Sequence, residues 1–224
     1  TSHGNPAPPP GFQLLVRYVD QLCYKFGIPP VKPEAVFSGS TGGAQGGERV
    51  DLSDAEVVHL GRKSLVVKTP LHNAVIKVAT QRTIEHEVNI HRAVDGPNFV
   101  RRGLRHGRIE GADDGLECLE LEHWCTRVSA NKLKEDNLFQ QAWEQAEAAV
   151  DHLHKANILH RDIKPANFLM HEGRLLLNDF DVSCFIRDQE ARKQHPVGTV
   201  SFWSPSCDVH IKDWLYDKDD DWMG

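Results

Sequence analysis

Residues 160–167 read HRDIKPAN, and residues 179–181 read DFD. The first stretch brings a carboxylate (Asp162), an ammonium group (Lys164) and an amide (Asn167) into one short loop, and Asp179 adds a second carboxylate. Phosphoryl transfer needs such groups: one to orient the attacking hydroxyl, a cation near the transferred phosphate, and oxygen ligands for Mg²⁺. The alternative is a polar surface loop with ordinary charges, but the length of the first motif and its distance from the second argue strongly against it.

Composition limits the classes of protein that this chain can belong to. Its 224 residues suggest one domain or two small ones, and 40% hydrophobic residues are enough for a real core. A net charge of −6 argues against nucleic-acid and anionic-membrane partners, and no apolar run approaches the length of a membrane span. The five cysteines form no C-x-x-C pair, which favours reduced thiols and an intracellular location, cytoplasmic or nuclear. The oligomeric state is left open.

The chain divides into an N-terminal extension and a main domain. In the extension, residues 1–37, apolar side chains recur at helical spacing from Phe12 to Phe26, which predicts one amphipathic helix. Residues 38–48 are rich in Gly and Ser and are expected to form a flexible linker.

The main domain begins with strands and continues with helices. Turn-like breaks separate three β-rich runs, which predicts an antiparallel meander over residues 56–60, 64–68 and 74–78. Helical spacing predicts helices near residues 81–94 and 137–155. The buried face of the second helix is expected to carry Phe139, Ala142, Ala146, Val150 and Leu153. Further strands are predicted near residues 104–109, 116–121, 158–159 and 175–177. Strands first and helices later favour an α+β fold in two lobes.

From about Asp54 onward these residues resemble the eukaryotic protein-kinase family, with features of its serine/threonine branch. The resemblance implies a bilobal protein-kinase-like fold, with an antiparallel β small lobe that carries one helix (residues 49–122) and a mainly helical large lobe (residues 123–224). The family's large lobe has further helices after the position of Gly224, so we expect this large lobe to be incomplete.

The resemblance assigns ATP-binding roles to residues of the small lobe. Residues 74–77 read AVIK, similar to the family's third strand, and Lys77 would hold the α- and β-phosphates of ATP. Glu87 stands where the family places the helix glutamate that pairs with this lysine. Glu85 is the competing candidate, but it lies two residues earlier and should face away if Glu87 faces inward.

Residues 119–124 resemble the strand that leads into the hinge between the lobes. Leu121 would then line the back of the adenine pocket, and backbone groups of Glu122 to Trp124 would hydrogen-bond adenine. An ordinary edge strand remains the alternative interpretation of this segment.

The resemblance also gives each polar group of the catalytic stretch a role. Asp162 would accept or orient the proton of the substrate hydroxyl, and Lys164 would stabilise the γ-phosphate. Asn167 and Asp179 would hold the metal ions. Thr199, in the segment GTVSFW at residues 198–203, would contact Asp162 and Lys164.

The small lobe departs from the family pattern in its phosphate-binding loop. Only Gly61 fits the glycine-rich motif, because Lys63, Val66 and Lys68 occupy the positions of the later glycines and the valine. Glycines let backbone N–H groups approach phosphates closely. A tight turn is expected to replace that loop, with Arg62 or Lys63 providing positive charge instead.

The large lobe departs from the pattern in three places. Asp181 replaces the glycine of the usual D-F-G, and Ser206 follows Pro205 where the family has glutamate. Residues 184–197 contain no Ser, Thr or Tyr that a phosphate could modify. Arg161 therefore needs another partner, and our hypothesis is that Asp188 or Glu190 provides it. The aspartate that anchors the catalytic loop is expected to be Asp220.

Three functions follow from these residues. The first is a serine/threonine protein kinase that uses ATP and Mg²⁺ and acts on a protein substrate. The second is a pseudokinase or kinase-like binding module, which the altered glycine loop and Asp181 favour. The third is a small-molecule phosphotransferase of related fold. Because every polar group that touches the chemistry is present, the first interpretation is preferred.

Overall fold

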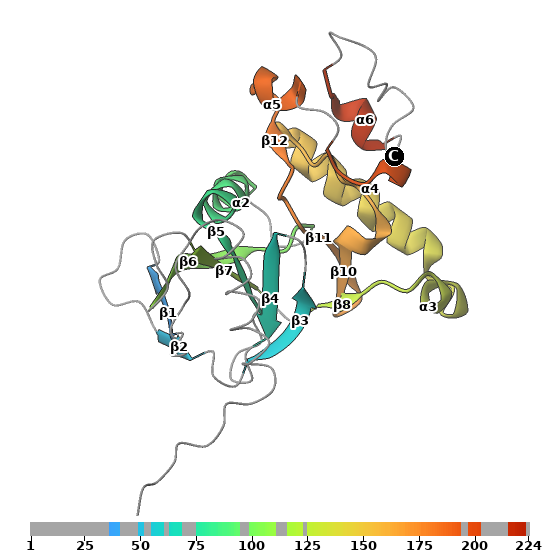
Figure 1. Ribbon diagram of the computed structural model, residues 1–224. Coiled ribbons are helices and arrows are strands. Elements are labelled where there is room, and N and C mark those ends of the chain that lie inside the picture. The colour runs from blue at the N-terminus through green and yellow to red at the C-terminus, as the bar shows by residue number, and fades with distance from the viewer. Residues whose placement is uncertain are drawn as a thin grey trace, which may run out of the picture. The chain divides into compact units, whose positions relative to one another are not determined.

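A computed structural model describes residues 36–40, 49–51, 55–60, 63–68, 75–94, 99–110, 116–122, 125–193, 197–202 and 215–222 (Figure 1). The chain divides into two compact units. Unit 1 comprises Thr1–Val88 and Gly103–Trp124, and unit 2 comprises Asn89–Arg102 and Cys125–Gly224. The second boundary falls close to the one predicted between the lobes, but residues 89–102 belong to unit 2.

Unit 1 is built on a seven-stranded antiparallel sheet with the strand order β2-β1-β6-β7-β5-β4-β3. Its strands are β1 (Val36–Ser40), β2 (Arg49–Asp51), β3 (Glu56–Leu60), β4 (Ser64–Lys68), β5 (Val75–Thr80), β6 (Gly103–Glu110) and β7 (Leu116–Leu121). The predicted meander is confirmed, because β4 pairs with β3 on one side and β5 on the other. The two strands predicted near residues 104–109 and 116–121 are β6 and β7.

Helix α2 (Gln81–Ala93) follows β5 directly and matches the helix predicted near residues 81–94. Thr80 caps it, since its Oγ1 accepts a hydrogen bond from the Thr83 backbone N–H at 3.4 Å. Ile84 and Val88, four residues apart on one face, join the buried cluster that Val75, Leu119 and Leu121 form on the sheet.

The predicted linker is wrong for residues Ser38–Ser40, which form the second half of β1. Strand β1 pairs with β2 and, over its whole length, with β6. Without β1, strand β6 would be an edge strand, whose exposed backbone N–H and C=O groups any extended segment can satisfy. Such pairing depends on the backbone, so a Gly- and Ser-rich composition does not reveal it. The remainder of the predicted linker, residues 41–48, lies outside the described residues.

Unit 2 combines helices with short strands. Its elements are β8 (Thr126–Arg127), α3 (Ala130–Glu135), α4 (Phe139–Lys155), β9 (Ile158–Leu159), η1 (Pro165–Asn167), β10 (Phe168–His171), β11 (Arg174–Leu177), β12 (Cys184–Phe185), α5 (Gln189–Lys193), η2 (Val200–Phe202) and α6 (Lys218–Trp222). Sequence periodicity predicted α4, β9 and β11 but none of the other short elements. Together with unit 1, these elements confirm the α+β class.

Helix α4 supplies much of the core of unit 2. Ala149, Val150 and Leu153 pack with buried side chains that include Phe168 and Phe180. The helix ends at Lys155, and Asn157, two residues later, has a φ of 59°, the left-handed conformation that follows many helices. One residue of the predicted buried face is wrong: Phe139 is 60% exposed. It stands in the first turn of α4, where less of the surrounding core reaches the helix.

Short strands position the catalytic stretch. Strands β10 and β11 form a hairpin whose two turn residues, Glu172 and Gly173, both have positive φ, as a tight two-residue turn requires. Residues 160–167 connect β9 with β10, and Asp179 follows β11. Phe168 at the start of β10 pairs with Leu177 at the end of β11, so the catalytic stretch enters the hairpin beside the point from which Asp179 follows.

Several sequence predictions lie outside the described residues. They are the helix at Phe12–Phe26, Gly61 of the phosphate-binding loop, Trp124 of the hinge, and the Pro205–Ser206 pair. Within the described part of the chain, no helix combines the length and the apolar character that a membrane span requires.

Candidate active site

Asp162 lies at the centre of a hydrogen-bonded network in unit 2. Its Oδ2 accepts hydrogen bonds from Lys164 Nζ at 2.6 Å and from Asn167 Nδ2 at 3.0 Å. Asn167 Nδ2 also donates to the backbone carbonyl of Asp162 at 2.8 Å. These contacts fix both the side chain and the backbone of Asp162, so its carboxylate has one defined orientation.

The other carboxylate oxygen, Asp162 Oδ1, is buried and has no hydrogen-bond partner among the described residues. A buried acceptor without a partner costs about 1–3 kcal/mol. A ligand hydroxyl that donates to Oδ1 recovers this free energy. The network therefore presents a fixed acceptor for a proton, which is what a general base requires.

Thr199 joins the network through Lys164, whose Nζ donates to Thr199 Oγ1 at 2.7 Å. No direct hydrogen bond joins Thr199 to Asp162 in the described structure; both bind the same ammonium group. The preceding Gly198 has a φ of +79°, and a Cβ there would collide with the Arg161 carbonyl oxygen. Glycine is therefore required for this segment to approach the catalytic loop.

Asn167 and Asp179 are the residues expected to hold a metal ion. The amide nitrogen of Asn167 donates to two acceptors on Asp162, which leaves its amide oxygen as the atom that could bind a metal ion. Asp179 has a φ of 71°, an unusual conformation for a residue other than glycine. An amide oxygen and a carboxylate are hard oxygen ligands of the kind that Mg²⁺ prefers. The donor chemistry fits the predicted ion.

Phe180 and Asp181 follow Asp179. Phe180 is fully buried between the rings of His91 and His160, with centroid separations of 5.1 and 5.3 Å. Asp181 is not among the described residues with positive φ. The backbone conformation seen here therefore does not require glycine at position 181.

In unit 1, Lys77 and Glu87 form a buried ion pair. Lys77 lies on β5 and Glu87 on α2, so the strand and the helix that packs on it each contribute one charge. Glu85 is exposed and accepts a hydrogen bond from Gln81 Nε2 at 2.8 Å. Of the two candidate glutamates, the structure joins Glu87 to Lys77.

The other predicted ATP-binding residues of unit 1 are partly described. Leu121 ends β7 and is buried in the cluster beneath α2, and Glu122 follows it with intermediate exposure. Lys63 is exposed at the turn before β4, while Val66 packs against the same cluster as Leu121.

The anchoring aspartate is Asp221, so the prediction of Asp220 is wrong. Asp221 Oδ1 accepts from the Arg161 N–H at 2.8 Å and Oδ2 from the His160 N–H at 2.9 Å. Two side chains complete its shell, His154 Nε2 at 2.9 Å and the Tyr216 hydroxyl at 2.8 Å. Asp220 instead accepts from the Asp217 N–H at the start of α6. Neighbouring helical residues point about 100° apart, and sequence alone did not give the rotation of α6.

The hypothesis for the partner of Arg161 is also wrong. Arg161 Nε donates to the Val182 carbonyl at 2.7 Å, and its Nη1 donates to the Ala191 carbonyl. Among the residues that the structure describes, Arg161 forms no ion pair with Asp188 or Glu190. Asp188 caps α5 by accepting from the Ala191 N–H at 2.9 Å, and Glu190 pairs with Lys193 on the surface. Backbone carbonyls thus take the place predicted for a carboxylate.

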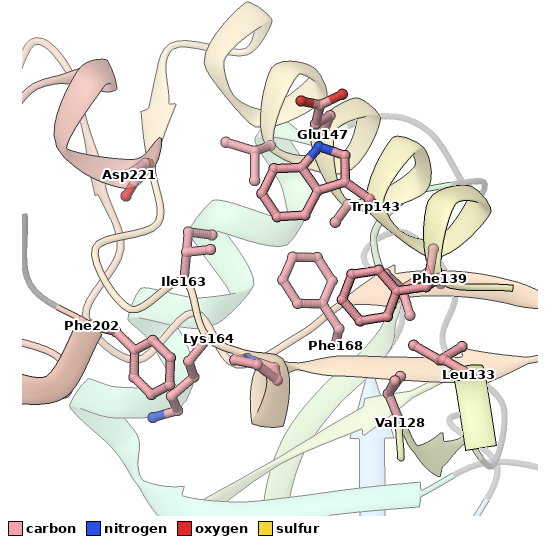
Figure 2. A pocket seen from close by; sticks show the side chains of 15 residues that line it. Val128, Leu133, Phe139, Trp143, Glu147, Ile163, Lys164, Phe168, Phe202 and Asp221 are labelled. Atoms are coloured by element: carbon pink, nitrogen blue, oxygen red, sulfur yellow. The ribbon is translucent and has the colours of Figure 1, made fainter. Parts of the chain in front are cut away.

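An apolar pocket of about 320 Å³ lies beside the catalytic loop in unit 2 (Figure 2). Phe139 and Trp143 of α4 line it and are 60% and 55% exposed. Ile163 and the stem of Lys164 close one end, and the Lys164 amino group points away from the rings of Phe139, Trp143 and Phe168. Because mainly apolar side chains line this pocket, it offers few of the polar groups that phosphate binding needs. The polar groups lie on the catalytic loop beside it.

The two groups that order the catalytic loop have shifted pKa values. Burial lowers the pKa of His160, against the opposing effect of Asp221, Asp179 and Asp162. Burial alone would raise the pKa of Asp221, but the hydrogen bonds from His154 and from the backbone of Arg161 and His160 oppose it, and the net shift is downward. The structure therefore favours a neutral imidazole next to an ionised carboxylate.

We expect the folded protein to lose stability as the pH falls below about 6.5, the pKa of an unfolded histidine. The folded-state pKa of His160 is lower, so the unfolded state binds the proton first and gains free energy from it. Protonation would also oppose the hydrogen bond that His160 Nδ1 accepts from the Asp162 N–H at 3.2 Å. Urea unfolding at pH 7.5, 6.5 and 5.5 should show a smaller loss for His160→Gln than for wild type, and equal losses would contradict this account.

Comparisons with known proteins agree with the site. A family model described as Protein kinase domain matches residues 55–222. The chain is 31% identical to CBL-interacting protein kinase 5 of Oryza sativa subsp. japonica, over 64% of this chain and 32% of that protein. It is 35% identical to serine/threonine-protein kinase MPS1 of Encephalitozoon cuniculi (strain GB-M1), over 38% and 15% of the two chains. It is 40% identical to serine/threonine-protein kinase mph1 of Schizosaccharomyces pombe (strain 972 / ATCC 24843), over 32% and 11%. The alignments thus cover about a third or less of each of these relatives.

Proposed function

Since this chain belongs to the family of eukaryotic-type protein kinases, we propose that it transfers the γ-phosphate of ATP, with Mg²⁺, to serine or threonine hydroxyls of a protein substrate. The observation that carries the proposal is the carboxylate of Asp162. Lys164 and Asn167 hold one of its oxygens, while the other is buried without a partner among the described residues.

In this proposal, Asp162 acts on the attacking hydroxyl. The substrate O–H donates to Oδ1, and the proton moves to the carboxylate as the oxygen bonds to the γ-phosphorus. The bond from that phosphorus to the bridging oxygen breaks, and ADP leaves with the electron pair. Lys164, 2.6 Å from the same carboxylate, lies near enough to offset the negative charge of the transferred group.

The remaining residues act as binding groups in this proposal. In unit 1, Lys77 would bind the α- and β-phosphates, and its ion pair with Glu87 orients the ammonium group. In unit 2, Asn167 and Asp179 would hold Mg²⁺, which offsets phosphate charge when bound. Leu121 would line the adenine site, with Glu122, Trp124 and Gly61 as further candidate contacts to the nucleotide.

The names of the relatives and the position of Thr199 support serine and threonine as acceptors. Several relatives bear the name serine/threonine-protein kinase. In this chain Thr199 accepts from Lys164 at 2.7 Å, so the loop that would receive the substrate is tied to the catalytic lysine. We propose that this contact aligns a small hydroxyl side chain with Asp162.

Thermal unfolding with nucleotide tests the binding step. Saturating ATP with Mg²⁺, at about 100 times its Kd, should stabilise the wild-type protein by about 2.7 kcal/mol, and ATP without Mg²⁺ should do so less. Asp179→Asn should lose the Mg²⁺-dependent part, because an amide replaces a charged metal ligand. Asp151→Asn, the same chemical change at an exposed position of α4, serves as control. A folded wild-type protein that shows no shift would contradict the proposal and favour a binding module without catalysis.

A further inference from the structure

Arg192, in α5, contacts residues on either side of this helix in the sequence. Its side chain is only 12% exposed. Its Nε donates to the Tyr216 carbonyl at 2.7 Å, and its Nη1 donates to the Ile186 carbonyl at 3.2 Å. Its Nη2 lies 3.5 Å from Asp217 Oδ2. One guanidinium thus joins α5 to the strand end before it and to the residues that precede α6.

Arg161 also contacts this helix. It belongs to the catalytic loop and donates to the carbonyls of Val182 and Ala191. Ala191 is the residue next to Arg192, so α5 accepts one guanidinium contact from the catalytic loop at Ala191 and extends a second guanidinium, that of Arg192, to Tyr216. Asp188 caps the start of α5 by accepting from the Ala191 N–H, which stabilises the helix that carries the Ala191 carbonyl.

The contacts close into a ring. The backbone of Tyr216 accepts from Arg192, and its hydroxyl donates to Asp221 Oδ1 at 2.8 Å. Asp221 accepts from the backbone of Arg161, whose guanidinium returns to α5. All five residues of this ring lie in unit 2. Displacing any one of them therefore disturbs the backbone from which Asp162 projects.

Every acceptor in this ring is a backbone carbonyl or a carboxylate. Residues 184–197 contain no hydroxyl that a phosphate could modify. The two guanidinium groups that could bind a phosphate already have partners. Arg161 donates to two carbonyls, and Arg192 donates to two carbonyls and lies beside Asp217.

We propose that Arg192 is a positioning residue for the phosphoryl-transfer reaction, and that it orders the catalytic loop without phosphorylation at Ser183, at Thr199 or at any residue between them. We call the ring Arg161–Ala191–Arg192–Tyr216–Asp221 the Arg192 clamp. The inference rests on the proposed kinase function for its effect on rate. The ordering of the loop itself does not depend on that function.

Kinetics test the effect on rate, with Arg192→Ala beside Lys193→Ala. Lys193 is the next residue of α5, carries the same charge, and pairs only with Glu190 on the exposed surface in the described structure. Arg192→Ala should lower kcat by about a hundredfold, the loss expected from a displacement on the order of 1 Å. The KM for ATP and the number of Mg²⁺·ATP sites per chain should stay within twofold, whereas simple misfolding would reduce the number of sites. Lys193→Ala should match wild type.

Phosphatase treatment tests independence from phosphorylation. Wild-type protein that intact mass shows to be free of phosphate should keep its full kcat. If activity is lost on treatment and returns with phosphate at Ser183 or Thr199, the proposal is overturned. Equal kcat values for Arg192→Ala and Lys193→Ala overturn it as well.

Hydrogen exchange separates failure of the clamp from failure of the kinase function. Arg192→Ala should speed amide exchange by about tenfold or more in residues 158–163 and 184–193, since it removes the charge-assisted hydrogen bonds to the Tyr216 and Ile186 carbonyls. Lys193→Ala should leave both segments unchanged. If exchange rises as expected in a chain that transfers no phosphate, the clamp stands and the proposed function fails. Unchanged exchange in Arg192→Ala overturns the clamp whatever the activity.

Discussion

Asp162→Asn should reduce kcat by about 10²–10⁴-fold, the usual contribution of a positioned general base, or roughly 3–5 kcal/mol in activation free energy. The substitution keeps the size of the side chain and an oxygen for Lys164. It removes the charge that makes Oδ1 a proton acceptor. Because Asp162 is not one of the residues proposed to hold the metal, Mg²⁺·ATP should still stabilise the variant. Initial rates and thermal shifts on the same preparation measure both effects.

The matched control is Asp151→Asn, which makes the same chemical change on the exposed face of α4. It should keep wild-type rates, since Asp151 takes no part in the network around Asp162. A loss of less than about tenfold in Asp162→Asn would remove this carboxylate from the role of base. Loss of Mg²⁺·ATP binding together with activity would place Asp162 among the binding groups instead.

Asp221→Asn should destabilise unit 2 by about 3–5 kcal/mol, the range measured when one partner of a buried charged network is removed. Asp221 accepts from two backbone N–H groups and from two side chains, and it is almost completely buried. An asparagine turns an NH₂ group toward some of these donors, so at least one of them loses its acceptor. Urea unfolding of both proteins at pH 7.5 measures the difference, and kcat should fall with it.

Asp220→Asn is the matched control, one residue earlier on α6. Its carboxylate, at the third position of α6, accepts from the Asp217 N–H at 2.8 Å, and the amide oxygen of asparagine can accept the same bond. Its cost should stay below about 1 kcal/mol. The pKa of Asp221 is lowered in the folded state, so its contribution is complete above about 3.9 and is lost as the pH falls through the folded pKa. The gap between wild type and Asp221→Asn should therefore close in acid. A larger cost for Asp220→Asn would contradict the assignment of the anchor.

Sequence reasoning succeeded where local spacing determines the contact. Asp162, Lys164 and Asn167 lie within six residues of one another, and a loop that short brings their side chains into hydrogen-bonding range. The choice of Glu87 over Glu85 followed from the family resemblance, and helical geometry added that residues two apart should not face the same strand. The meander β3–β5 and helix α4 were also predicted correctly, because the periodicity of apolar residues is a local pattern.

Predictions from sequence were wrong where contacts between distant parts of the chain determine the structure. The pairing of β1 with β6 depends on backbone groups far apart in the chain and leaves little trace in composition. The anchor depends on the rotation of α6, a short helix of acidic residues with no apolar stripe to reveal its buried face. The partner of Arg161 was sought among charged side chains, whereas the structure supplies carbonyl oxygens, which every residue carries.

Arg192 and His154 were missed for a related reason. Each carries a polar group that serves a distant backbone or carboxylate, and neither lies in a motif. One sequence signal was available for His154: it falls four residues after Val150 on the apolar face of α4, where a histidine needs a buried partner. No comparable signal marks Arg192.

Whether this chain phosphorylates serine and threonine is tested by transfer of labelled γ-phosphate from ATP to a mixture of proteins that offer serine, threonine and tyrosine. The label is then traced to the amino acid that carries it. The account predicts Mg²⁺-dependent label on serine and threonine, absent from the Asp162→Asn reaction. A folded protein that binds Mg²⁺·ATP yet labels no hydroxyl, or labels tyrosine alone, would contradict the account.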